Sequence, residues 1–234
     1  YSVTYETWRY FTLKALDERK ENAGLEITDE FIASDEGKAL NESILAEADE
    51  SIKSLYAVFA LAKEYGIDIE NEAIIESANA AVESQEASYE SKRAYKKALE
   101  DEHMTKTVAH TVAVFDTVYS EIYEAMLNSG EIVTDREKLR EIYFYITRGI
   151  WDIALEDAAF SLGIGEISGV IEGGDGCRIL MRAEKESSYI DENESTLFDT
   201  YREGVFRRKI EDAVAGITLE KEPLCPEYTV YTMK

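Results

Sequence analysis

The sequence predicts a mainly α-helical protein, a long-helix antiparallel bundle with a small β-hairpin or sheet near the C-terminus. Two observations lead to this prediction. Apolar side chains recur every three or four residues over long stretches, and the only two prolines, Pro223 and Pro226, both lie close to the end of the chain. Because proline is the strongest helix breaker, residues 1–222 can form long helices without interruption from it.

The first predicted helix covers residues 1–23. Tyr5, Trp8 and Phe11 follow helical spacing, and Gly24 is suited to end the helix in a left-handed conformation. The aromatic side chains of this segment have two interpretations. They pack in a core, which we favour, or they form a belt at a membrane interface, where Tyr and Trp are enriched.

The second predicted helix covers residues 35–65 and has an apolar seam with alternating spacings of three and four residues. Its members are Leu45, Ala48, Ile52, Leu55, Phe59 and Ala62. Such a seam indicates a helix face that is buried against other helices, as in a coiled coil.

Residues 69–128 have helical periodicity throughout and contain neither Gly nor Pro. One unbroken helix of this length would extend about 90 Å at 1.5 Å per residue, which suits a long coiled coil. A break near residues 101–107 would suit a compact bundle instead. The absence of a strong breaker favours one long or gently kinked helix.

The pattern changes after the next predicted helix, residues 134–162, which begins with a capping box at Thr134. Residues 166–183 read as a β-hairpin around a glycine-rich turn, and residues 195–215 read as a helix. In the tail, residues 228–233, side chains alternate weakly in the pattern of a β-strand, and such a strand could pair with the hairpin.

We therefore predict two parts within one domain. Residues 1–162 form the helical bundle, and residues 163–234 contain the hairpin, one helix and a β-like tail packed on the bundle.

The chain is strongly acidic, with 49 acidic and 25 basic residues and a formal net charge of −24. This charge repels phosphate backbones, so we expect no nucleic-acid partner. It also disfavours docking on anionic lipid. No run of about 18 apolar residues occurs, as a membrane span would need. The sequence leaves open a membrane anchor upstream of Tyr1.

Two cysteines, Cys177 and Cys225, could form one disulfide. In an exported protein we expect this bond, because it would tie the tail to the second strand of the hairpin. The alternative is a pair of free thiols, as a reducing cytosol would maintain.

Glu100 and His103 form a Glu-x-x-His, the spacing that di-iron helix bundles use. The second histidine, His110, has Thr107 where a glutamate would be needed, which excludes a symmetric di-iron site. Glu100 and His103 therefore stay as candidates for an asymmetric metal site, although a chain with so many acids contains such pairs by chance.

No Gly-x-Ser-x-Gly, Walker A or Cys-x-x-Cys motif occurs, so we assign no catalytic residue and no cofactor. We expect a non-enzymatic helical domain, extracytoplasmic or at the cell surface, that is sensory or ligand-binding, with a protein or small-molecule partner. One alternative is a structural or assembly subunit of a surface layer, filament or virion, which would form homo-oligomers. The other is a ferritin-like metal enzyme.

Overall fold

The computed structural model describes residues 1–24, 26–135, 138, 151–173, 176–184, 186–223, 225 and 228–233, and it contains two compact units. Unit 1 combines Tyr1–Ile122 with Ala213–Lys234, and unit 2 is Tyr123–Asp212. The C-terminal segment belongs to unit 1, so unit 2 is an insertion within the sequence of unit 1.

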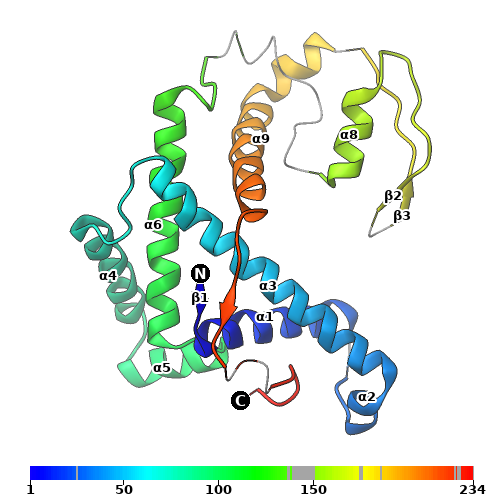
Figure 1. Ribbon diagram of the computed structural model, residues 1–234. Helices are drawn as coiled ribbons and strands as arrows, with labels where there is room; N and C mark the ends of the chain where they lie inside the picture. Colours follow the sequence, from blue (N-terminus) through cyan, green and yellow to red (C-terminus); the bar gives the residue numbers. More distant parts are fainter. Residues whose placement is uncertain are drawn as a thin grey trace. The chain divides into compact units, whose positions relative to one another are not determined.

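Helices make up most of the structure, and an antiparallel hairpin lies near the C-terminus, which confirms the predicted fold class (Figure 1). Within the described residues the helices are α1 (Tyr5–Ala23), α2 (Asp29–Ala33), α3 (Asp35–Glu64), α4 (Glu72–Ala87), α5 (Lys92–Asp101), α6 (Lys106–Ser129), α8 (Ile153–Ser161) and α9 (Ser187–Val214). The strands are β1 (Ser2–Val3), β2 (Ile171–Gly173), β3 (Gly176–Arg178) and β4 (Glu220–Lys221). Much of the helix predicted over residues 134–162 lies outside the described residues.

Helix α1 begins and ends at strong local signals. The Thr4 hydroxyl accepts a hydrogen bond from the Thr7 backbone N–H (3.3 Å), and the Glu222 carboxylate accepts one from the Tyr5 N–H (2.8 Å). Gly24 ends the helix at a φ of 58°, as the sequence predicts. These bonds satisfy backbone groups that a helix terminus leaves unpaired.

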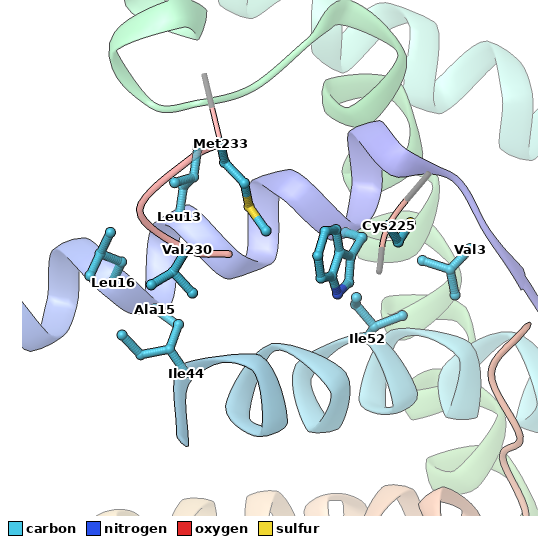
Figure 2. Close-up of a cluster of buried hydrophobic side chains, with 10 residues drawn as sticks. Val3, Leu13, Ala15, Leu16, Ile44, Ile52, Cys225, Val230 and Met233 are labelled. Carbon is cyan, nitrogen blue, oxygen red and sulfur yellow. The ribbon is translucent and has the colours of Figure 1, made fainter. Parts of the chain in front are cut away.

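The core of unit 1 lies between α1, α3 and the C-terminal segment (Figure 2). Trp8 is 2% exposed, so the aromatic residue at the centre of the N-terminal cluster packs in the core. The predicted seam of α3 is buried at every position except Leu45, which is half-buried. Burying side chains of this size is the main favourable term in folding, at roughly 25 cal/mol per Å² of apolar surface.

A short parallel pairing of β1 with β4 joins the start of unit 1 to its C-terminal segment. The register places Ser2 opposite Glu220 and Val3 opposite Lys221. The Lys221 ammonium lies 2.7 Å from the Asp49 carboxylate on α3 and 5.4 Å from the centroid of the Trp8 ring. Strand β4 is thus fixed to both helices of the core.

The prediction of one long helix over residues 69–128 is wrong, because this stretch forms α4, α5 and α6. The Ser91 hydroxyl accepts a hydrogen bond from the Ala94 N–H (3.1 Å), and the Thr105 hydroxyl accepts one from the Val108 N–H (3.2 Å). Hydroxyl caps can start a new helix without any Gly or Pro before it. The long coiled coil expected from this segment is therefore not formed.

The tail does not pair with the hairpin as a strand. Within residues 228–233 the backbone forms turns, and Val230 and Met233 are buried in the core of unit 1. The Val230 N–H donates to the Asn41 side-chain oxygen (2.9 Å), and the Tyr231 hydroxyl donates to the Gly37 carbonyl (2.6 Å). Both partners lie on α3, which holds the tail against that helix.

In unit 2, the hairpin of β2 and β3 packs beside α8 (Figure 1). Beyond the paired strands, Ile167 bridges Met181, and the Ser168 N–H donates to the Leu180 carbonyl (2.8 Å). Ile179 and Met181 are two apart and so point to the same side, and they are 63% and 64% exposed. The outer face of the hairpin is therefore apolar and exposed in the structure as described.

The expected Cys177–Cys225 disulfide is not present, since both cysteines are free thiols. Cys225 is fully buried beside Trp8 in the core of unit 1, whereas Cys177 is exposed on β3 in unit 2. Packing, and not a covalent bond, fixes the tail. Burial, together with the nearby Glu222 charge, raises the pKa of the Cys225 thiol.

Across the described ranges, no helix is both long enough and apolar enough to cross a membrane.

Candidate functional site

A pocket of about 380 Å³ lies in unit 1, on one side of α1. Its walls come from α1, from α2 and the loop before it, from the turn after α5 and from the tail. The lining residues are Arg9, Leu13, Leu16, Asp17, Lys20, Ile27, Ile32, His103, Val230, Tyr231 and Met233. Its volume is within the range of pockets that hold small organic molecules.

Helix α1 supplies one wall because its pocket residues share a face. Arg9, Leu13, Leu16 and Lys20 are separated by four, three and four residues, which places them along one side of a helix. Leu13 and Leu16 are buried, whereas Arg9 and Lys20 are half-buried. The wall is therefore apolar at its centre and cationic at both ends.

His103 reaches the pocket through an unusual turn at the end of α5. Its φ is 57°, and it is the one non-glycine residue with a positive φ among those described. The Met104 N–H donates to the Leu99 carbonyl (2.7 Å) and the His103 N–H donates to the Glu100 carbonyl (3.1 Å). This is the Schellman pattern, in which the left-handed position is usually Gly. A residue with a Cβ costs roughly 1–2 kcal/mol there.

The imidazole of His103 joins a polar cluster at the rim of the pocket. Its Nε2 lies 2.7 Å from the Asp17 carboxylate, and the Lys20 ammonium lies 3.0 Å from the other oxygen of that group. The Arg9 guanidinium donates to the His103 carbonyl (3.1 Å). Arg9 and Asp17 therefore hold the turn from two sides, which compensates for the left-handed backbone.

Asp17 is ionised in this cluster. Partial burial alone would raise the pKa of its carboxyl group, but the hydrogen bonds from Lys20 and His103 outweigh burial and lower the pKa. The carboxylate is thus an internal counter-ion for the two donors beside it.

The tail closes the apolar side of the pocket. Figure 2 shows the side chains of Val230 and Met233 beside Leu13 of α1. Tyr5 and Tyr228 add an aromatic contact with ring centroids 5.2 Å apart at the start of this segment. The pocket therefore depends on residues from both ends of the described sequence.

The two predicted metal candidates point to different partners. Glu100 is exposed on α5, with its carboxylate 3.4 Å from the Lys96 ammonium, whereas His103 pairs with Asp17. In the described part of the chain, no group of three or more His, Cys, Asp or Glu side chains is placed to hold a metal ion.

Sequence reasoning singled out His103 but missed Arg9, Asp17 and Lys20. The helical spacing of Arg9, Leu13, Leu16 and Lys20 was a signal for a mixed apolar and cationic face. No local pattern relates α1 to His103 or to the tail, because these segments are far apart in the chain.

Comparison with protein families, with curated proteins and with solved structures found no match for this chain.

The lining combines an apolar interior with charged groups at the rim. Among the described lining residues, Arg9 and Lys20 are cationic and Asp17 is anionic, so these three sum to 2 − 1 = +1, in a chain of net charge −24. Apolar walls can hold a ligand by burial, and a few charged groups can orient it.

Proposed function

We propose that the chain is a non-enzymatic ligand-binding domain, and that its binding site is the pocket beside α1. The observation that carries this proposal is a pocket of about 380 Å³ whose described lining is mostly apolar and includes a few charged side chains. That combination is typical of sites for small organic molecules.

The chemistry of the lining supports binding over catalysis. Its imidazole and carboxylate are hydrogen-bonded to each other, and the part of the lining that the structure describes includes no serine, threonine or cysteine as nucleophile. A general base needs a reacting group within its reach, whereas His103 and Asp17 here stabilise a strained turn. These two side chains therefore stabilise the turn, and they also lie in the pocket lining, where a ligand would contact them.

A neutral fluorescent probe, N-phenyl-1-naphthylamine, tests the proposal. Its fluorescence rises in apolar surroundings, and we expect saturable binding by the whole chain. Ile32→Trp should abolish this binding, because Ile32 lies in the pocket wall. Ala33→Trp is the matched control, since Ala33 is the next residue of α2, is exposed and lies outside the lining.

Equal probe binding by both tryptophan variants would place the probe elsewhere, for example on the apolar hairpin of unit 2. Absence of saturable binding by the unmodified chain would contradict the proposal directly.

The proposal includes a sensory or ligand-binding role outside the cytoplasm or at the cell surface. The coding sequence upstream of Tyr1 tests this location. A signal peptide or a stretch of about 20 apolar residues there would support it. An initiating Met immediately before Tyr1 would count against it.

A second candidate function is an assembly subunit, and the exposed face of the hairpin favours it. Four large apolar side chains in this region are between 63% and 66% exposed: Ile167, Val170, Ile179 and Met181. Large exposed apolar surfaces often mark protein interfaces. Light scattering over a range of concentrations tests this idea. Association that Ile179→Lys abolishes would support it, and a monomer at all concentrations would exclude it.

A further inference from the structure

We propose that the ligand of this pocket is an organic anion, a single carboxylate or sulfonate on an apolar chain, with its charged group at Lys20. This inference rests on the proposed ligand-binding function and adds the chemical class of the ligand. Four described lining residues carry side-chain donors: Arg9, Lys20, His103 and Tyr231. His103 Nε2 is already bonded to Asp17 and the Tyr231 hydroxyl to the Gly37 carbonyl.

The local charge is opposite to that of the whole chain. Acidic residues outnumber basic ones by 49 to 25, yet Arg9 and Lys20 both line this pocket, and Asp17 is the only acidic residue among the described residues of the lining. A cationic ligand would find acidic groups over much of the surface, but an anion would find few basic sites. A cationic rim in such a chain therefore favours an anion.

Asp17 does not prevent this binding, because its charge is already compensated. One oxygen lies 3.0 Å from the Lys20 ammonium and the other lies 2.7 Å from His103 Nε2. An ammonium carries three N–H donors, and the described contacts of Lys20 use one of them. Lys20 can thus donate to a ligand while it stays bonded to Asp17.

The apolar part of the ligand follows from the rest of the lining. Leu13, Leu16, Val230 and Met233 are each less than a tenth exposed, and Ile27 and Ile32 complete the wall. An alkyl or aryl chain would contact these side chains while its acidic group stays at the half-buried rim. Each methylene placed in such a wall raises affinity about fourfold.

Displacement of N-phenyl-1-naphthylamine by three ligands of one chain length tests the inference. At pH 7.5, octanoate is an anion, 1-octanol is neutral and octylamine is a cation. We expect octanoate to bind at least about tenfold more tightly than 1-octanol, since a hydrogen bond to a charged group contributes a factor of ten or more. Octylamine should bind more weakly than 1-octanol.

Substitutions in α1 test whether Lys20 is responsible for the preference for octanoate. Lys20→Met should remove most of the octanoate preference and leave 1-octanol affinity within about twofold, and Lys20→Arg should restore the preference. Arg19→Met is the matched control, because Arg19 loses the same charge from the same helix but pairs with Glu47 outside the pocket. Should Lys20→Met fail to fold, added salt provides a second measurement. It should weaken octanoate binding to the unmodified chain and spare 1-octanol.

The outcomes separate the two proposals. Equal or tighter binding of 1-octanol or octylamine, with probe displacement intact, overturns the anion class and leaves the ligand-binding function standing. An octanoate preference that Lys20→Met and Arg19→Met reduce equally also overturns it. Failure of every ligand and of the probe overturns both.

Discussion

Two short C-terminal segments of similar apolar character have opposite fates in this molecule. Met233 in the tail of unit 1 is 7% exposed, whereas Met181 in the hairpin of unit 2 is 64% exposed. The tail lies against a surface that α1 and α3 provide, and the outer face of the hairpin has no such surface in the described structure. Whether such a segment is buried therefore depends on the presence of another apolar surface for it to pack against, and not on its own composition.

The two cysteines give the largest expected contrast between the units. Cys177 is exposed and Cys225 is buried, and the raised pKa of Cys225 further lowers its thiolate fraction. In the folded protein we expect N-ethylmaleimide to modify Cys177 at least about a thousandfold faster, because Cys225 reacts only after opening. Mass spectrometry of quenched samples measures both rates. If neither cysteine reacts until the protein is reduced, the two cysteines form a disulfide, and this prediction is wrong.

Truncation of an apolar side chain should have a larger effect on stability in the core of unit 1 than on the exposed hairpin of unit 2. Ile52 is fully buried in unit 1, so Ile52→Ala should cost about 2–5 kcal/mol, whereas Ile179→Ala on the exposed hairpin should cost about 0.5 kcal/mol or less. Urea unfolding followed by circular dichroism measures both losses, since both units contain helices. Equal losses would contradict the burial assigned to Ile52.

Substitution of a glycine by alanine should also have different effects on stability in the two units. A Cβ added at the buried Gly37 would overlap with the Phe31 carbonyl of α2, so we expect Gly37→Ala to cost about 1–3 kcal/mol. Gly169 in the hairpin region has open space around it, and Gly169→Ala should change stability by about 0.5 kcal/mol or less. Thermal melts followed by circular dichroism measure both. A neutral Gly37→Ala would mean that α2 packs less closely on α3.

Left-handed backbone follows two helices of unit 1 at different residue types. Helix α1 ends at Gly24 with a φ of 58°, whereas the turn after α5 has His103 at 57°. Both His103→Gly and His103→Ala lose the imidazole, but only glycine relieves the turn. We therefore expect His103→Gly to be about 1 kcal/mol more stable than His103→Ala, the reverse of the order within a helix. Urea unfolding of the two variants measures this difference. Greater stability of the alanine variant would show that His103 does not adopt a left-handed conformation.

The smallest predicted effect concerns pH. Hydrogen bonds lower the pKa of Asp17 below its ordinary value of 3.8 despite partial burial. Its contribution is therefore complete above that value and is lost as the pH falls through the folded-state pKa. Asp17→Asn should cost only about 0.5 kcal/mol at pH 7, because the side chain is 43% exposed and the interaction is screened.

Urea unfolding of the unmodified chain and of Asp17→Asn, from pH 7 downward, should show the difference shrinking below pH about 4. The control is Asp199→Asn in unit 2, where Asp199 is 61% exposed beside Arg202. We expect a smaller effect there. A stability difference at Asp17 that does not change with pH would show that the carboxylate charge is not what stabilises the turn.

Local signals in the sequence were sufficient for α1, α3 and the hairpin. The helix end at Gly24 and the α3 seam depend only on neighbouring residues, and so does the pairing of the short strands β2 and β3. The breaks between α4, α5 and α6 were missed because they rely on hydroxyl caps at Ser91 and Thr105, which are common residues in other contexts.

The pocket was harder to predict for a different reason. The face of α1 that carries Arg9 and Lys20 could have been found from spacing alone. The contact of His103 with Asp17 spans 86 positions, and that of Val230 with Asn41 spans 189. Such contacts depend on tertiary packing, which hydrophobic periodicity does not encode.

The pairing of β1 with β4 has a consequence for synthesis on the ribosome. Tyr5 and Glu222, which meet at the start of α1, are 217 residues apart. At typical bacterial and eukaryotic rates, roughly 10–40 s pass between the translation of one and of the other. Throughout that interval the apolar side of α1 lacks Cys225, Val230 and Met233. The nascent chain must therefore keep Trp8 and its neighbours from aggregating until the last part of unit 1 emerges.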